Sequence, residues 1–284
     1  MPRRPTIAEK RRSYRELHET GCFVLPNPWD VGTARYLQHL GYKALASTSS
    51  GFAFSLGLPD ADWAVPLDLV LAHLRDLVEA TDLPVNADFE SGYAHAPDGV
   101  AENVRRCVET GVAGLSIEDT TGDKARPLYE FELAVERIRA ARDAIDAAGG
   151  DVVLTGRCET FLIGQPDLDE AVRRLRAYAD AGADCLYAPG LRTREQIAAV
   201  VAAVAPKPVN FLMAGPLGMT VSDVADLGVR RISIGSSLAR AAWGGFIRAA
   251  REIAEEGRFD ALGQGAPFND LNGFFRDDFK RRQS

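Results

Sequence analysis

The stretch Leu83-Pro84-Val85-Asn86-Ala87-Asp88-Phe89-Glu90-Ser91-Gly92-Tyr93 decides how the rest of the chain is interpreted. Its first half is a short apolar run after a proline, which is typical of a buried parallel strand. Its second half carries two acids, a serine and a glycine. Because an unpaired charge at the end of a buried strand is costly, these carboxylates predict a compensating cation nearby.

Two later apolar runs end in charged residues in the same way. Gly114-Leu115-Ser116-Ile117 leads into Glu118-Asp119, and Val152-Val153-Leu154-Thr155-Gly156 leads into Arg157-Cys158-Glu159. The carboxyl ends of parallel strands gather at one face of a barrel or sheet, so these charges are expected to share a single mouth.

The chain alternates between expected strands and helices. We expect strands near residues 22–25, 44–46, 84–88, 114–117, 152–156, 184–188, 208–212 and 231–235. Helices are expected near 6–20, 30–39, 66–80, 98–110, 130–147, 168–180, 193–204, 221–226 and 238–256, with a long loop over 47–60. Four helices end at a glycine (Gly41, Gly111, Gly182 and Gly228) shortly before the next strand.

This repeat predicts an α/β fold, a (β/α)8 TIM-type barrel with an extra N-terminal helix. An open doubly wound sheet is disfavoured because no G-x-G-x-x-G motif follows the first strand. We interpret residues 1–284 as one barrel domain in which 257–284 form a C-terminal helical extension. Five apolar residues of that extension favour packing on a neighbouring subunit, although covering the barrel bottom is the alternative: Phe268, Leu271, Phe274, Phe275 and Phe279.

The composition excludes several classes of function. The formal net charge is −7 with interspersed acids and bases, which argues against nucleic acid or an anionic membrane as a partner. No apolar run approaches the roughly 20 residues that span a bilayer, and the basic N-terminus lacks an apolar segment after it. The four cysteines show no paired spacing. We therefore expect a cytoplasmic protein with reduced thiols.

The acids at the strand ends predict a metal site. Mg²⁺ prefers one or two carboxylates together with waters and substrate oxygens, so Asp88 and Glu118 are the predicted ligands and Glu90 an additional candidate. Arg157 is the predicted clamp for a carboxylate, because a guanidinium offers two parallel hydrogen-bond donors. The alternative is a structural network in which Arg157 pairs with these acids or with Glu159.

Two other polar segments are weaker candidates. Ser47-Thr48-Ser49-Ser50-Gly51 offers hydroxyl and backbone N–H groups to a carboxylate or phosphoryl group, although such a run is often only a loop. Gly235-Ser236-Ser237 opens the last helix, where an ordinary N-cap is the favoured interpretation. Among the histidines, His95 is the one expected in a loop above the mouth.

Together these motifs resemble the isocitrate lyase/phosphoenolpyruvate mutase superfamily. The resemblance runs from Asn27-Pro28-Trp29-Asp30 to the last strand and includes Leu58-Pro59-Asp60. It implies a barrel that binds Mg²⁺, with Mn²⁺ as an alternative, and a small carboxylic acid that forms an enolate. It also implies a homo-oligomer, a dimer of dimers, in which a C-terminal helix is exchanged.

Carried over residue by residue, the resemblance gives each candidate a role. Ser47, Thr48 and Ser49 would bind the substrate carboxylate, and Asp60, a catalytic candidate, would lie beside the metal-bound substrate. Asp88 and Glu118 would organise the metal and its waters, while Arg157, also a catalytic candidate, would hold the substrate. Asn86, Glu90 and Asn210 complete the substrate-binding candidates.

The departures from the superfamily limit the assignment. Its lyases carry a Lys-x-Cys-Gly-His loop, whereas residues 120–127 read Thr-Thr-Gly-Asp-Lys-Ala-Arg-Pro, in which Lys124 is a catalytic candidate by position. Asn86 replaces a metal-side aspartate, and Tyr187-Ala188-Pro189-Gly190 lacks the glutamate of the lyases. We expect a Mg²⁺-dependent lyase that cleaves a C–C bond of a small 2-oxo or 2-hydroxy acid through an enolate. The alternatives are phosphonomutase-type P–C chemistry and a barrel that binds a 2-oxo acid without turning it over.

Overall fold

The computed structural model describes residues 3–61, 63–164 and 166–283. They fall into two compact units, one within residues 5–236 and one of residues 237–283 with residues 3 and 4. The first unit contains all eight strands, in the order and close to the positions expected. The strands are β1 (Phe23–Leu25), β2 (Leu45–Ala46), β3 (Val85–Asp88), β4 (Gly114–Glu118), β5 (Val153–Arg157), β6 (Cys185–Tyr187), β7 (Val209–Leu212) and β8 (Arg231–Ser233).

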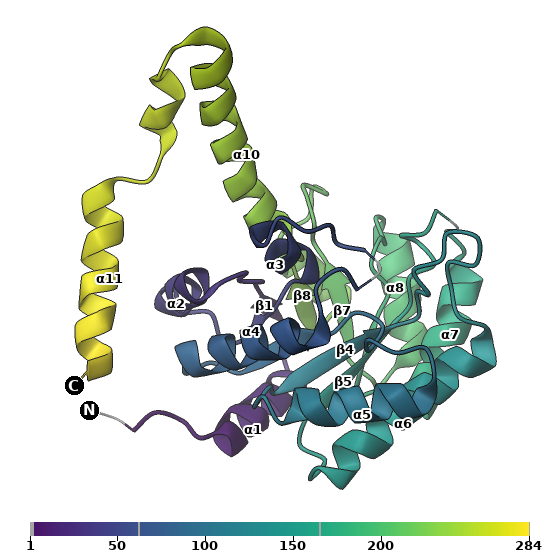
Figure 1. Cartoon of the computed structure of the whole chain (residues 1–284). Helices are drawn as coiled ribbons and strands as arrows, with labels where there is room; N and C mark the ends of the chain where they lie inside the picture. The colour runs from purple at the N-terminus through teal and green to yellow at the C-terminus, as the bar shows by residue number, and fades with distance from the viewer. Residues whose placement is uncertain (1–2, 62, 165, 284) are drawn as a thin grey trace. The chain divides into compact units, whose positions relative to one another are not determined.

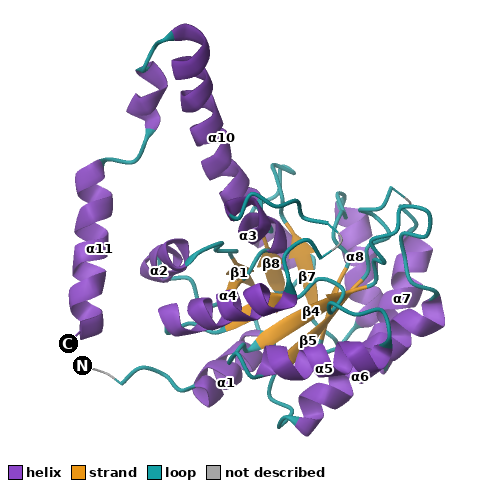
Figure 2. Ribbon diagram, in the orientation of Figure 1, coloured by secondary structure: helices purple, strands orange, loops and turns teal. Residues whose placement is uncertain are grey.

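The strands form one parallel sheet in the order β1-β8-β7-β6-β5-β4-β3-β2. The amide of Ala46 at the end of β2 donates to the carbonyl of Pro26 after β1 at 3.0 Å, so the two ends of the sheet meet. Helices alternate with the strands around the sheet (Figures 1 and 2). The prediction of a (β/α)8 TIM-type barrel is confirmed.

The helices of the first unit begin with the expected extra one, α1 (Ile7–Leu17). The others are α2 (Val31–His39), α3 (Ser49–Ser55), α4 (Leu67–Ala80), α5 (Pro97–Val108), α6 (Phe131–Ala147), α7 (Leu168–Asp180), α8 (Arg194–Val204) and α9 (Val221–Asp226). The predicted loop over 47–60 is wrong in its first part, because α3 occupies it. The Thr48 hydroxyl accepts a hydrogen bond from the Gly51 amide and caps this helix.

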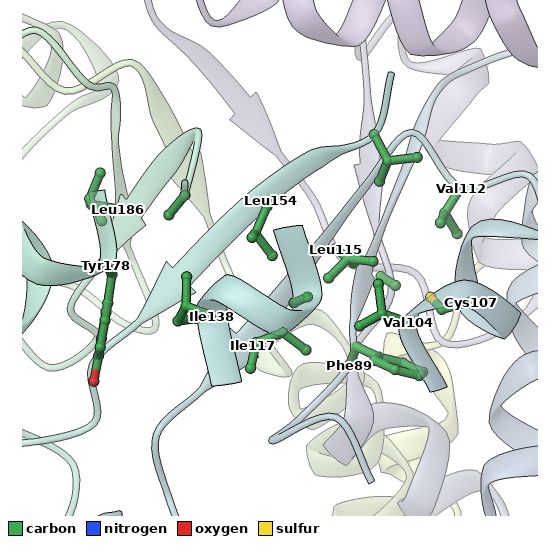
Figure 3. Close-up of a cluster of buried hydrophobic side chains, with 14 of the residues drawn as sticks. Phe89, Val104, Cys107, Val112, Leu115, Ile117, Ile138, Leu154, Tyr178 and Leu186 are labelled. Carbon is green, nitrogen blue, oxygen red and sulfur yellow. The ribbon is translucent and has the colours of Figure 1, made fainter. Parts of the chain in front are cut away.

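The core lies mainly between the strands and the helices. Side chains alternate along each strand, so Leu115 and Ile117 of β4 and Leu154 of β5 point outward toward α5 and α6 (Figure 3). All three are at most 1% exposed. Each such side chain stabilises the fold by about 1.5 to 3 kcal/mol through burial alone. The intervening residues of the same strands face into the barrel and toward its mouth.

The amino-terminal ends of the strands are closed by α1. Its Tyr14 is fully buried in a small second cluster with Phe23, Val153 and Cys185, the first residues of β1, β5 and β6. The Tyr14 hydroxyl also accepts a hydrogen bond from Arg231 of β8 at 2.9 Å. The extra helix therefore fills the bottom of the barrel and leaves the opposite, carboxyl-terminal end for the site.

The second unit consists of helical segments. These are α10 (Ser237–Arg251), a π-helical turn η1 (Glu252–Glu256), a 3₁₀ turn η2 (Asp260–Gln264) and α11 (Phe268–Gln283). The expected helix over 238–256 thus changes to a π turn at Glu252, while the extension after 257 is helical as expected. Across the described residues, no helix is both long and apolar enough to cross a bilayer.

Candidate active site

The charged strand ends do meet in one mouth. Arg157 Nη1 at the end of β5 lies 3.2 Å from Asp88 Oδ1 of β3 and 3.1 Å from Glu118 Oε2 of β4. Its Nε donates to Glu159. The parallel register dictates this meeting, because Glu118 pairs directly with Arg157 across the sheet. Arg157 therefore forms the network of ion pairs that was the alternative to a substrate-binding role. Its position at the mouth also fits the predicted role of binding a substrate carboxylate.

The second oxygen of Asp88 is held by the segment after β2. Ser49 donates to Asp88 Oδ2 from its amide at 2.9 Å and from its hydroxyl at 3.0 Å. Ser47 binds the backbone of the same residue, because its hydroxyl accepts from the Asp88 amide at 2.8 Å. Asp60 lines the same inner cavity as Ser47, Ser49 and Asp88. The serines and Asp60 are therefore gathered around the predicted metal ligand.

Burial of these acids perturbs their protonation. Burial raises the pKa of Glu118 well above its usual value, although Arg157 acts in the opposite direction. Burial and the nearby charges of Asp88 and Asp60 raise the pKa of Glu90 to about 7, against the lowering effect of a hydrogen bond from Tyr93. Several acids are thus crowded at the mouth, where Arg157 alone pairs with Asp88, Glu118 and Glu159.

The donor set fits a hard divalent cation. The described residues contain no group of three or more His, Cys, Asp or Glu side chains arranged as a complete metal cage. Mg²⁺ does not require one, since it is commonly held by one or two carboxylates with waters and substrate oxygens filling the other positions. Asp88 and Glu118 supply such carboxylates, and the uncompensated negative charge around them would be relieved by a cation.

The other predicted substrate residues lie at different depths. Asn86 and Asn210 line an inner cavity of about 220 Å³ that also reaches Asp88, Asp60 and Arg157. Their side chains are already bonded within the barrel, Asn86 to the Tyr14 hydroxyl at 3.2 Å and Asn210 to Arg231 at 2.8 Å. They belong to the layer beneath the carboxylates.

Two further candidates have contrasting positions. Thr48 is 2% exposed, and its hydroxyl caps α3. Lys124 lines an outer cavity of about 960 Å³ from the loop between β4 and α6. Leu128 pairs with Thr120 in an isolated antiparallel bridge at the base of this loop. The structure therefore places Lys124 at the mouth, whereas the Thr48 hydroxyl caps α3.

A buried acid supports the mouth from behind. Asp119 is 3% exposed and accepts hydrogen bonds from the Tyr178 hydroxyl at 2.6 Å and from Arg174 at 3.2 Å. Its other oxygen accepts from the backbone amide of Glu159 at 2.8 Å. Asp119 therefore fixes the chain directly after Arg157. The position of Asp119 directly after Glu118 marks it as a residue near the mouth. Its partners Arg174 and Tyr178 could not be predicted, because they lie on the distant helix α7.

The aromatic lining of the outer cavity was not predicted from the sequence. Trp63, Tyr129 and Leu133 line this cavity together with His95. The His95 Nδ1 and the Tyr129 hydroxyl are 2.6 Å apart. No local pattern links Trp63, His95 and Tyr129, because they come from three separate connections of the barrel.

Comparison with known proteins agrees with this geometry. The sequence profile described as phosphoenolpyruvate phosphomutase matches residues 14–254. An uncharacterized protein of Mycobacterium tuberculosis is 32% identical over 266 residues, which cover 91% of this chain and 94% of that protein. An oxaloacetate decarboxylase of Paraburkholderia xenovorans is 31% identical over 242 residues, covering 81% and 76% of the two chains.

A solved structure is closer still. A Burkholderia cenocepacia protein described as a lyase or mutase superposes with a TM-score of 0.90 at 47% sequence identity, over 95% of this chain and 96% of that one. The profile match and these relatives show that the chain belongs to the isocitrate lyase/phosphoenolpyruvate mutase superfamily, a group of carbon–carbon lyases and phosphonomutases.

Proposed function

We propose that this protein is a Mg²⁺-dependent lyase that breaks a carbon–carbon bond of a small 2-oxo or 2-hydroxy carboxylic acid. The observation that carries the proposal is the meeting of Asp88, Glu118 and Arg157 at three adjacent strand ends, where Arg157 Nη1 lies 3.2 Å from Asp88 and 3.1 Å from Glu118. The relative named as an oxaloacetate decarboxylase supports cleavage of a C–C bond over P–C chemistry.

Asp88 and Glu118 would hold the metal ion, with Mn²⁺ as an alternative to Mg²⁺. When bound, the ion would supply positive charge where the acid becomes negative as its bond breaks. Ser49 would keep the Asp88 carboxylate in place through its two hydrogen bonds, and Ser47 would hold the Asp88 backbone, as they do in this structure. This preorganisation matters because a fixed charge stabilises a transition state without having to rearrange.

The remaining candidates act on the substrate itself. Arg157 would hold its carboxylate through two parallel N–H donors. Asp60 lies beside Ser49 at the junction of the inner and outer cavities, where it would orient the bound acid. Lys124 would bring a positive charge to the acid from the loop that lines the outer cavity.

The cleavage step requires a place for an electron pair and a source for a proton. In a decarboxylation the C–C bond to the carboxylate breaks, the carboxylate leaves as CO₂, and the electron pair of the bond stays on the remaining carbon as an enolate. A proton must then reach that carbon. The loop over residues 120–127 contains neither cysteine nor histidine, so the proton would come from another group in the mouth or from water.

Turnover assays test the proposal directly. The enzyme would be incubated with Mg²⁺ and oxaloacetate, malates, methylisocitrate or phosphonopyruvate, and the products identified by mass spectrometry. We expect a C–C cleavage product that disappears on chelation of the metal and falls at least 100-fold in Arg157→Lys, which keeps the charge but loses the fork. An Asp68→Ala variant is the matched control, since this acid on α4 is 83% exposed.

The description of the matching family favours one alternative, P–C bond chemistry on a phosphonopyruvate-like acid. Turnover of phosphonopyruvate without C–C cleavage of any acid would establish this alternative and refute the lyase. Binding of 2-oxo acids without any product would instead point to a non-catalytic binding barrel.

We also propose a cytoplasmic homo-oligomer, a dimer of dimers. All four cysteines are free thiols, which fits a reducing compartment. In the second unit Phe268 is 78% exposed and Phe259 is 64% exposed. These side chains would be covered if the extension packed on a neighbouring subunit, and sedimentation velocity would give the number of subunits.

A further inference from the structure

The outer cavity is larger than a small acid requires. It measures about 960 Å³, next to an inner cavity of about 220 Å³ around Asp88 and Arg157. Pockets of about 300 to 1,000 Å³ hold ligands of drug-like size. The outer cavity therefore has room for a substituent that projects from the carboxylates toward the solvent.

One wall of the outer cavity is aromatic. The rings of Trp63 and His95 lie 4.9 Å apart between centroids, and those of His95 and Tyr129 lie 6.0 Å apart. We refer to these three residues as the aromatic wall. Leu128 and Leu133 line the same cavity. Flat rings and aliphatic side chains at these spacings form a surface for an apolar group.

Three polar atoms of the aromatic wall are already partnered within the protein: the Trp63 indole nitrogen, the His95 Nδ1 and the Tyr129 hydroxyl. The Trp63 indole N–H donates to the Ser91 hydroxyl at 3.1 Å. The Tyr129 hydroxyl and the His95 Nδ1 lie 2.6 Å apart and bond to each other. On this side of the cavity a ligand would therefore meet mainly ring surface, which favours an alkyl or aryl group there, whereas charged residues such as Lys124, Arg126 and Glu130 line other parts of the cavity.

The protein holds this wall in place at a cost in backbone strain. Trp63 has a φ of 53°, in the left-handed region that a bulky side chain rarely adopts. Glu90 and Tyr93 share this feature, with φ values of 44° and 54°, and all three lie around the mouth. Strained positions of this kind persist where the surroundings enforce them and are concentrated at functional sites.

A buried arginine fixes the other part of the aromatic wall. Arg137 of α6 is 1% exposed and donates to the backbone carbonyls of Ser91, Ala94 and His95. Its guanidinium carbon lies 3.9 Å from the centroid of the Tyr129 ring. One side chain thus ties the loop that carries His95 to the residue that His95 contacts, so little freedom remains to be lost when a ligand binds.

We propose that the aromatic wall is a specificity subsite for an alkyl or aryl substituent on the acid, attached at the carbon that becomes negative during cleavage. The inference rests on the proposed function, because it assumes that the acid group binds at Asp88, Glu118 and Arg157. It identifies the substrate class as a substituted 2-oxo or 2-hydroxy acid rather than an unsubstituted acid of three or four carbons.

Oxalate, oxamate and N-phenyl oxamate separate the two sites. Oxalate occupies only the inner position, whereas the phenyl group of N-phenyl oxamate extends from the atom that replaces the reacting carbon. Their dissociation constants would be measured by calorimetry on the full-length protein with Mg²⁺. We expect N-phenyl oxamate to bind at least ten-fold more tightly than oxamate, the gain that favourable ring contacts provide.

Variants of the wall residues then show which side chains provide the gain in affinity. Trp63→Ala is expected to lose at least ten-fold in affinity for N-phenyl oxamate while changing that for oxalate by less than about two-fold. His95→Ala, a truncation on an exposed loop, should reproduce the selective loss and serves if Trp63→Ala does not fold. Tyr36→Ala is the matched control, since this aromatic residue of α2 is 42% exposed.

Each outcome has a distinct meaning. Equal affinities for N-phenyl oxamate and oxamate in the wild-type protein would overturn the subsite, as would equal losses for oxalate and N-phenyl oxamate in both wall variants. If oxalate itself fails to bind with Mg²⁺, the proposed function fails and the subsite falls with it. Binding of oxalate without a phenyl preference would overturn the subsite alone.

Discussion

Removing Arg157 should destabilise the protein in a way that Mg²⁺ repairs. The side chain of Arg157 is 17% exposed and pairs with Asp88 and Glu118, which are 18% and 12% exposed. In Arg157→Leu these acids would face one another without a cation. Loss of one partner from a buried ion pair costs about 3 to 5 kcal/mol, and the residual solvent access places this site at about 3 kcal/mol.

Mg²⁺ should reduce this deficit because it restores positive charge between the same carboxylates. A ligand at 100 times its Kd stabilises the folded state by about 2.7 kcal/mol. Binding should be tighter in Arg157→Leu than in the wild-type protein, since the competing guanidinium is gone. The free energy of unfolding would be measured by urea titration, followed by circular dichroism, with and without MgCl₂.

Arg174→Leu is the matched control for this experiment. Arg174 is also buried, with its side chain 7% exposed, and it pairs at 3.2 Å with Asp119, which lies behind the mouth. Its removal should also destabilise the fold by about 3 kcal/mol or more, with no recovery in Mg²⁺. If the deficit of Arg157→Leu is equally unaffected by Mg²⁺, the reasoning that these carboxylates form a cation site is refuted.

Three further predictions concern stability. The pKa of Glu90 is raised to about 7, so the stability conferred by its protonated form is present below pH 4.5 and lost as the pH rises through 7. The free energy of unfolding of Glu90→Gln, measured without metal, should therefore gain about 1 to 3 kcal/mol relative to wild type across this window. A difference between the two proteins that does not change with pH would contradict this prediction. The pKa of His73 is lowered to about 4 mainly by burial, so the stability conferred by its neutral form is present above pH 6.5 and lost as the pH falls toward 4. A His73→Phe variant also removes a buried Nε2 that lacks a hydrogen-bond partner within the described chain, and it should lose less stability on acidification than the wild type. Identical dependence of the unfolding free energy on pH in the two proteins would refute this. In Gly114→Ala the new methyl group would lie 2.6 Å from both Asn86 Oδ1 and Tyr14 Cε1, so the thermal midpoint should fall by an amount equivalent to about 1 to 3 kcal/mol, whereas a wild-type midpoint would show that the barrel bottom adapts freely.

The barrel could be predicted from the sequence because its signals are local and repeated. Each strand is a short apolar run, and glycines such as Gly111 and Gly182 adopt the positive φ that ends the preceding helix. The structure places every expected strand within a few residues of its predicted position. The helix at Ser49–Ser55 was missed because it is only seven residues long and depends on the single cap from Thr48.

The meeting of Asp88, Glu118 and Arg157 was equally predictable, because parallel strands in register bring their carboxyl ends together. The depth of Asn86 was harder to foresee. It shares a face of β3 with Asp88, but two residues along a strand correspond to about 6.6 Å, which places Asn86 in the layer that contacts Tyr14.

The aromatic wall was beyond the reach of sequence patterns. Trp63, His95 and Tyr129 are separated by more than 30 positions each, and their contacts depend on the conformation of three loops. Arg137 gave no signal either, because a single arginine in a helix is ordinarily a solvent-exposed residue. Its burial becomes understandable only when the three carbonyls that it satisfies are seen in the structure.

The measurement that tests the central claim most directly is the thermal midpoint of the protein with oxalate, with and without Mg²⁺. Oxalate mimics the enolate of pyruvate, and a ligand that binds only the folded state raises the midpoint. We predict a rise that requires both oxalate and Mg²⁺, is lost in Asp88→Ala and persists in Asp68→Ala. A rise that is independent of Mg²⁺, or that survives in Asp88→Ala, would contradict the assignment of a metal-supported acid site at the mouth of the barrel.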